Sequence, residues 1–112
     1  MSLLTCEIHG ERGAMTNASK SICHRVKSNL PIDQDSLAVI NVIYIDDGEL
    51  LYNENYFFTK DEFEKLNLHN NYKIISDEDE NSFHSFINGS LGIECVQCFK
   101  EYMNKNNIEF KF

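Results

Sequence analysis

The chain has 112 residues and a formal net charge of −8, with 42% apolar and 25% charged residues. This composition is that of a globular protein rather than a disordered one, and the length suits one domain. So acidic a chain, without a basic stripe, repels phosphate backbones, and we do not expect direct nucleic-acid binding. A basic protein partner would instead be attracted.

The chain shows no feature of export or membrane insertion. Its first residues lack a basic region followed by an apolar stretch, which a secretory signal requires. The longest apolar run, residues 37–45, is interrupted by Asn41 and is too short to cross a bilayer. We therefore expect a cytoplasmic protein with no membrane contact. Thiols stay reduced in that compartment, which favours metal binding over disulfides for paired cysteines.

The first half of the chain predicts strands around one helix. Residues 1–13 are expected to form a strand and a turn, and residues 17–29 a helix that Thr16 or Asn17 caps and Pro31 closes. Residues 37–45 are rich in β-branched side chains and apolar on both faces, which predicts a central strand covered on both sides.

A β-hairpin is expected next. The turn residues Asp46, Asp47 and Gly48 separate the central strand from residues 50–58, in which apolar and polar side chains alternate. Thr59 and Glu62 then form a capping box that predicts a short helix.

The second half predicts one more strand and further helical turns. Residues 72–75 are expected to form a strand, and the acidic run 77–80 a solvated loop. A helical turn or two should precede Gly89, and a helix with one apolar face should follow Cys98. The alternating tail 108–112 is compatible with an edge strand. The predicted fold is α+β, a single domain over residues 1–112 in which a mainly antiparallel sheet packs with two to four helices.

Two short cysteine motifs predict one metal site that joins the ends of the chain. Cys6 and His9 form a CxxH motif, and Cys95 and Cys98 form a CxxC motif. In each, the two-residue spacer lets a tight turn direct two ligand atoms at one point, and Gly10 suits the left-handed conformation that closes such a turn. Three cysteines and one histidine make a closed tetrahedral site for structural Zn²⁺. The pair resembles the zinc knuckles of treble-clef and zinc-ribbon proteins.

Other roles for the cysteines and histidines remain open. A CxxC motif at a helix start is also typical of redox pairs, and buried cysteines are often inert. Cys23 falls on the apolar face of the predicted helix and needs no function there, whereas His24 is expected to face solvent. His24 is an alternative ligand or partner contact.

The sequence does not favour an enzyme. His9-Gly10-Glu11 with the later CxxC motif resembles the zinc deaminase pattern, but Glu94 stands where that family has proline. Cys6 would also fill the coordination position that a catalytic water needs. No nucleophile elbow, metalloprotease motif or phosphate-binding loop is present.

The chain resembles bacterial immunity proteins that protect cells from contact-dependent and other polymorphic toxins. The resemblance lies in the opening from Cys6 to Gly10, the acidic stretches 46–49 and 77–80, and the closing Cys95–Cys98 motif. It implies a non-enzymatic protein that binds and occludes a basic toxin, commonly a nuclease. Tyr52, Tyr56 and Phe110 are expected to be exposed contact aromatics. The candidate partner-binding residues are Asp46, Asp47, Glu49, Tyr52, Tyr56, Asp77, Glu78, Asp79 and Glu80.

Two other classes stay open beside that one. A zinc-binding adaptor or regulatory module of a larger assembly would present the same surface to a different partner. A small zinc hydrolase or deaminase-like enzyme would need a metal position open to water.

Overall fold

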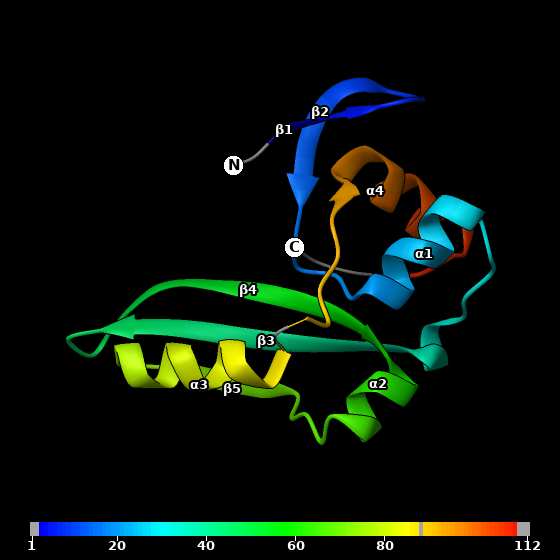
Figure 1. The fold of residues 1–112 in the computed structure, drawn as a ribbon. Helices are drawn as coiled ribbons and strands as arrows, with labels where there is room; N and C mark the ends of the chain where they lie inside the picture. The colour runs from blue at the N-terminus through cyan, green and yellow to red at the C-terminus, as the bar shows by residue number, and fades with distance from the viewer. Residues whose placement is uncertain (1–2, 88, 110–112) are drawn as a thin grey trace.

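The computed structural model describes residues 3–87 and 89–109, which form two three-stranded sheets and four α-helices (Figure 1). The smaller sheet has the strand order β1 (Leu3–Cys6), β2 (Gly10–Met15), β6 (Glu94–Cys95). The larger sheet has the order β4 (Glu49–Thr59), β3 (Leu37–Asp46), β5 (Asn71–Ile74). The helices are α1 (Lys20–Ser28), α2 (Lys60–Lys65), α3 (Asp77–Ile87) and α4 (Val96–Lys105), with a 3-10 turn, η1 (Gln34–Ser36), before β3. The predicted α+β class is confirmed.

The larger sheet is built on the predicted hairpin. β3 and β4 pair antiparallel along their whole length, and Asp47 and Gly48 turn the chain with φ angles of 50° and 78°. Positive φ at both positions matches the right-handed twist of the two strands. β5 pairs parallel to the other edge of β3, so β3 is the central strand. A parallel partner needs a crossover, and α2 lies in it.

Alternation along β4 divides the apolar side chains between two cores. Phe57 belongs to one core, together with residues of α1 and α4 such as Ile22 and Phe99. Tyr56 and Phe58 belong to the other core, with α3 residues such as Phe83. Figure 1 shows α1 and α4 on one side of the larger sheet and α2 and α3 on the other. The sheet is thus the middle layer that both cores share.

The backbone of residues 17–19 joins the two sheets. Phe57 N–H donates to the Asn17 carbonyl oxygen and Ser19 N–H to the Phe57 carbonyl oxygen, both at 2.8 Å. On the other side, Gly92 N–H donates to the Ala18 carbonyl oxygen at 2.9 Å. A side chain at Gly92 would start 3.0 Å from Cys23 Sγ, so glycine allows this close approach to α1.

These hydrogen bonds explain why the helix expected over residues 17–29 starts later. Ala18 and Ser19 form β-bridges with Phe57 and Leu91, so α1 begins at Lys20, and Ser19 caps it by accepting from Ile22 N–H. Asn29 ends the helix in the left-handed conformation with φ of 52°.

The acidic run 77–80 is the first turn of α3, and the expected loop is wrong. Ser76 and Asp79 cap this helix reciprocally: Asp79 N–H donates to Ser76 Oγ, and Ser76 N–H donates to Asp79 Oδ2, each at 3.3 Å. Acidic residues are stabilised at a helix N-terminus by the helix dipole. All four acidic side chains remain exposed.

Two expectations concern the chain ends and membranes. The expected tail strand lies partly in residues 110–112, outside the described residues, and Ile108 is buried in the core of α1 and α4. In the described part of the chain, no helix is long and apolar enough to span a bilayer.

The capping box at the start of α2 is confirmed and extends to α1. Glu62 Oε1 accepts from Thr59 N–H at 2.9 Å, from Thr59 Oγ1 at 3.0 Å and from the buried Ser19 Oγ at 2.7 Å. One carboxylate oxygen thus connects the caps of two helices that lie on opposite sides of the larger sheet.

Glu62→Ala should therefore lower the free energy of unfolding by about 1–3 kcal/mol, because it removes a cap and leaves the buried Ser19 hydroxyl without its acceptor. Urea denaturation measures this change. Glu64→Ala, at an exposed position of the same helix, is the control. Equal stability losses for both variants would contradict the assigned connection.

Candidate metal centre

The smaller sheet brings the two cysteine motifs together. Cys6 ends β1, His9 lies in the turn before β2, Cys95 ends β6 and Cys98 lies in the first turn of α4. β2 pairs with β1 on one side, with Cys6 opposite Gly10, and with β6 on the other, with Cys95 opposite Ala14. This central strand therefore sets the CxxH turn beside the CxxC motif, although more than eighty residues separate them in sequence.

The four side chains converge with the spacing of a tetrahedral metal site. His9 Nδ1 lies 3.6 Å from Cys6 Sγ, 3.4 Å from Cys98 Sγ and 3.9 Å from Cys95 Sγ. Cys6 Sγ and Cys98 Sγ are 3.4 Å apart, and all four ligand atoms lie within 4.8 Å of one another. A tetrahedral ion bound about 2.3 Å from sulfur and 2.0 Å from nitrogen would separate these atoms by about 3.5–3.8 Å. The residues present therefore fit one metal ion.

A disulfide does not explain this geometry. All four cysteines are free thiols, and the Cys6–Cys98 sulfur separation far exceeds the roughly 2.05 Å of a disulfide bond. Cys95 is the N-cap of α4, as in a redox pair. A redox pair would not require Cys6 and His9 to converge on it, whereas a metal site requires all four donors.

The thiols differ in their acidity. Backbone N–H groups of His9 and Ile8 stabilise the Cys6 thiolate and lower its pKa to about 6. Burial, followed by the neighbouring sulfur atoms of Cys6 and Cys95, raises the pKa of Cys98 to about 12. Three sulfur atoms at this spacing cannot all carry a negative charge without a compensating cation, which a bound metal ion would supply.

Glu101 completes the site from outside the four donors. Its Oε2 lies 2.6 Å from His9 Nε2, so the histidine presents Nδ1 toward the sulfurs. Carboxylates commonly orient metal-binding histidines in this way. Neither cysteine motif includes Glu101, so it was not among the predicted site residues. Its position three residues after Cys98 on a helix was the available signal, because residues with this spacing share a helix face.

The remaining cysteine and histidines lie outside this cluster. Cys23 is buried in the core of α1 and α4, as expected, and burial raises its pKa to about 11. His24 is exposed. His69 and His84 are also exposed, and His84 Nε2 lies 3.7 Å from Glu80. None of these belongs to the metal-ligating group found among the described residues.

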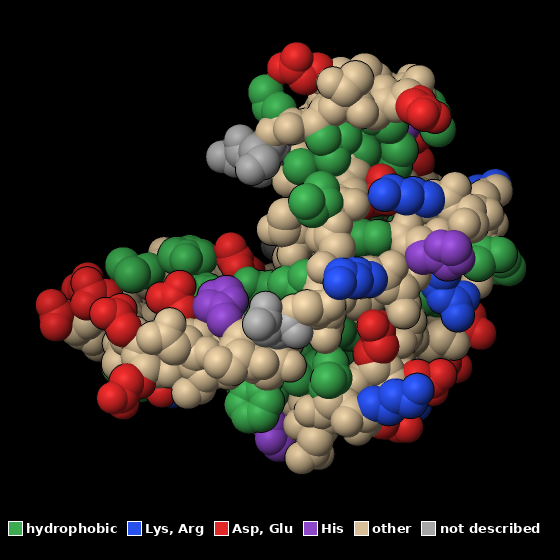
Figure 2. Space-filling model, in the orientation of Figure 1, with side chains coloured by type: hydrophobic (Ala, Val, Ile, Leu, Met, Phe, Trp, Pro, Cys, Tyr) green, Lys and Arg blue, Asp and Glu red, His purple; other side chains and the backbone are tan. Residues whose placement is uncertain are grey.

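The predicted acidic residues come from two segments that reach the same end of the molecule. Asp46, Asp47 and Glu49 lie at the tip of the β3–β4 hairpin, and residues 77–80 start α3. Figure 1 places the hairpin tip and the start of α3 at one end, and Figure 2 shows acidic side chains gathered there with apolar ones beside them. We call residues 46–52 and 77–80 together the acidic end.

The aromatic residues predicted for the partner surface have different environments. Tyr52 is 50% exposed and stacks on Tyr44 with ring centroids 4.4 Å apart. The expected exposure of Tyr56 is wrong, because it is 6% exposed and packs edge-on against Phe83 in the core. Its hydroxyl donates to Glu54 at 3.0 Å. Phe110 lies outside the described residues. Alternation along β4 places Tyr52 and Tyr56 on one face, but α3 covers only the second.

Leu50 and Leu51 were not predicted as surface residues of interest, yet they are 61% and 60% exposed beside Tyr52. All three exposed side chains belong to the segment 46–52 of the acidic end.

In comparisons with known proteins, no family model, curated protein or solved structure matches the chain.

Glu101→Gln should weaken metal binding about 10–100-fold, because the amide no longer accepts a charge-assisted hydrogen bond from His9. Competition with a chromophoric chelator measures the affinity, and circular dichroism confirms that the fold is kept. Glu64→Gln makes the same chemical change on the exposed face of α2 and should leave the affinity unchanged. Equal affinities for the two variants would exclude an orienting role for Glu101.

Proposed function

We propose that Cys6, His9, Cys95 and Cys98 bind one structural zinc ion. Three thiolates and one imidazole at tetrahedral spacing are the donor set that zinc prefers among the common biological metals. Four protein donors fill the coordination sphere and leave no position for a catalytic water. The ion would hold the N-terminal hairpin against the start of α4.

Cys95→Ser and Cys98→Ser should each release the zinc and lower the free energy of unfolding by several kcal/mol, as about 10–16 kcal/mol of binding energy supports folding at structural zinc sites. Native mass spectrometry of the untagged protein, repeated after denaturation, reports the metal, and thermal melting reports the stability. Cys23→Ser is the control and should keep the zinc, since Cys23 lies outside the cluster. A wild-type protein without metal, or an unchanged melting curve for Cys98→Ser, would refute the structural role.

For the whole protein we propose a non-enzymatic role as an immunity protein. It would bind a basic toxin with nuclease activity and occlude the active site of that toxin. The acidic end is the observation that carries this proposal. Two segments far apart in sequence gather their carboxylates there, and Leu50, Leu51 and Tyr52 of the same end are each exposed. Figure 2 shows apolar side chains beside the acidic ones at this end. A charged rim around exposed apolar and aromatic side chains is the usual composition of a protein-binding surface.

The physical mechanism follows from that composition. The carboxylates attract a positively charged cleft over long range and speed association. Tyr52 has the character of a binding anchor, because its stacking on Tyr44 already restricts its side chain before a partner arrives. The occluded surface of a nuclease would be the cleft that otherwise receives the phosphate backbone.

The other two classes predict different observations. A zinc-binding adaptor would use the same surface but would not have a toxin gene beside its own. A zinc hydrolase or deaminase-like enzyme would need a water on the metal, and the fourth ligand position that this requires is taken by Cys6. Glu11, which would be the proton-transferring residue of a deaminase, is exposed on β2.

The immunity role predicts that co-expression protects cells from the protein encoded by the neighbouring reading frame, and that the two purified proteins associate rapidly. A variant with Asp46→Asn, Asp47→Asn, Glu78→Gln and Glu80→Gln should associate at least tenfold more slowly at low salt, because it loses four charges of the acidic end. Stopped-flow kinetics at several salt concentrations measure the effect.

A matched control carries the same number of neutralised charges elsewhere. Glu11→Gln, Asp35→Asn, Glu64→Gln and Glu109→Gln replace four exposed residues outside the acidic end. This variant should associate nearly as fast as the wild type. Equal slowing in both variants would show that only net charge matters, and no protection by co-expression would exclude the immunity role.

A further inference from the structure

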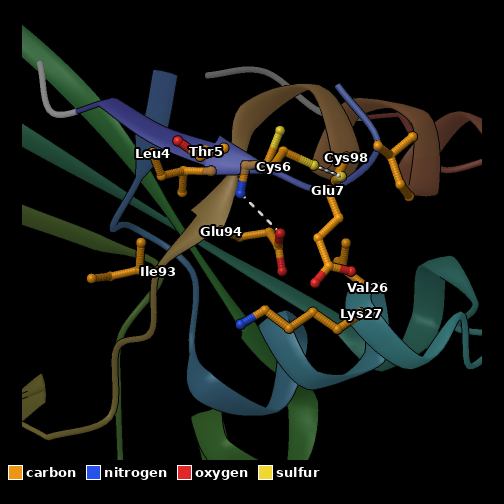
Figure 3. Close-up of a pocket in the computed structure, with 11 residues that line it drawn as sticks. Leu4, Thr5, Cys6, Glu7, Val26, Lys27, Ile93, Glu94 and Cys98 are labelled. Atoms are coloured by element: carbon orange, nitrogen blue, oxygen red, sulfur yellow. Dashed lines mark hydrogen bonds between the residues drawn. The ribbon is translucent and has the colours of Figure 1, made fainter. Parts of the chain in front are cut away.

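A cavity separate from the acidic end lies beside the proposed zinc site. It has a volume of about 620 Å³ and is bounded by β1, the turn after it, α1 and the segment that leads into α4 (Figure 3). The sulfur atoms of the metal cluster contribute one wall, and the carboxylate of Glu94 projects from β6 into the space (Figure 3).

Glu94 is the unusual residue of this cavity. Only 5% of its surface is exposed, although it is acidic. Its Oε1 accepts a hydrogen bond from Cys95 N–H at 2.8 Å, but its buried Oε2 has no hydrogen-bond partner in the described part of the chain. An unpartnered buried carboxylate oxygen costs free energy, and such groups in folded proteins normally have a donor. The oxygen is thus an acceptor that a ligand can satisfy.

The walls around this acceptor are mostly aliphatic. Leu4 and Val26 line the cavity, and Ile8 and Ile93 at its edge are 80% and 59% exposed. A carboxylate at the base of aliphatic walls suits a ligand with an apolar stem and a positively charged end. The side chains of arginine and lysine have this form, with several methylene groups that lead to a cationic donor.

The other charged residues of the cavity fit the same ligand. Glu7 extends a second carboxylate toward the space from the turn after β1, and Lys27 extends an ammonium group from α1 (Figure 3). Two carboxylates against one ammonium group leave the cavity negative, so it does not suit an anion. Glu94 Oε2 is fully buried, so a ligand reaches it only if neighbouring side chains move, and the exposed Glu7 and Lys27 are the ones free to do so. Lys27 would compete with a cationic ligand for this site.

We infer that this cavity is a binding site for an arginine or lysine side chain of a partner protein, which would donate to Glu94 Oε2 while its stem contacts Ile8 and Ile93. The origin of the side chain rests on the proposed protein-binding role. The site itself does not, because its chemistry can be tested on the protein alone.

The test is a titration of the zinc-loaded, ¹⁵N-labelled protein with butylguanidinium, which models an arginine side chain. Butylurea, a neutral analogue of nearly the same shape, is the control ligand. Butylguanidinium should bind saturably in the millimolar range, about the affinity expected of so small a ligand, and should shift the amide signals of Glu94, Cys95 and Lys27. Butylurea should bind at least tenfold more weakly. Equal binding of both compounds, or binding of neither, would overturn the inference.

The variant Glu94→Gln keeps an oxygen that can accept from Cys95 N–H but removes the charge. It should bind butylguanidinium at least tenfold more weakly while it retains its metal, and unchanged binding would overturn the inference. If Glu94→Gln loses its metal, Lys27→Met provides the test, because it leaves Glu94 intact and removes the competing ammonium group. Binding to that variant should be at least threefold tighter, and unchanged or weaker binding would count against the site.

This titration needs no partner protein, so its failure would leave the role of the acidic end untouched. In the same way, a failed protection assay would leave the cavity result standing.

Discussion

The apposition of the N-terminal hairpin and the start of α4 is the contact on which the candidate metal centre depends. It is held by few hydrogen bonds, because β6 has only two residues and pairs with the end of β2. Bringing together residues that lie more than eighty positions apart has a substantial entropic cost in a flexible chain. A metal ion that takes two ligands from each side would offset this cost by direct bonds. The short strands then need only to orient the ligands.

The larger sheet has a different source of stability. β3 and β4 pair over ten register positions, and both faces of the sheet are covered by apolar side chains along part of its length. No metal is needed to form such a hairpin with two cores. The two halves of the molecule therefore differ in what stabilises them, and they are joined by the hydrogen bonds of residues 17–19 and by the shared core around Phe57 and Phe99. Glu62 reinforces the segment 17–19 by accepting from the Ser19 hydroxyl.

Local sequence patterns predicted the elements whose causes are local. The hairpin turn at Asp47-Gly48, the capping box of Thr59 and Glu62, and the apolar face of α4 each depend on residues a few positions apart, and each is confirmed. The convergence of Cys6, His9, Cys95 and Cys98 was also predictable, because a two-residue spacer limits where two donors can point.

Local sequence patterns did not predict the contacts between residues that lie far apart in the chain. Helix α1 starts at Lys20 rather than at residue 17, because the backbone groups of Asn17 and Ser19 form hydrogen bonds with Phe57 of β4. No local sequence pattern predicts this long-range pairing. Tyr56 is buried because α3 covers its part of β4, whereas Tyr52 on the same face lies beyond that cover. The unpartnered oxygen of Glu94 likewise became visible only once its neighbours were known.

The placement of the two proposed contact sites also has a physical consequence. The acidic end lies at one end of the larger sheet and the Glu94 cavity lies between the smaller sheet and α1, so a partner that used both would contact two parts of the molecule that share the core around Phe57. Such binding is strongest when the two parts keep one relative orientation, because no free energy is then spent on ordering them. Loss of zinc would loosen the smaller sheet while the hairpin of the acidic end persists. A metal-free protein would accordingly keep its electrostatic attraction for a basic partner but lose the cavity contact, which separates the two contributions in a single protein.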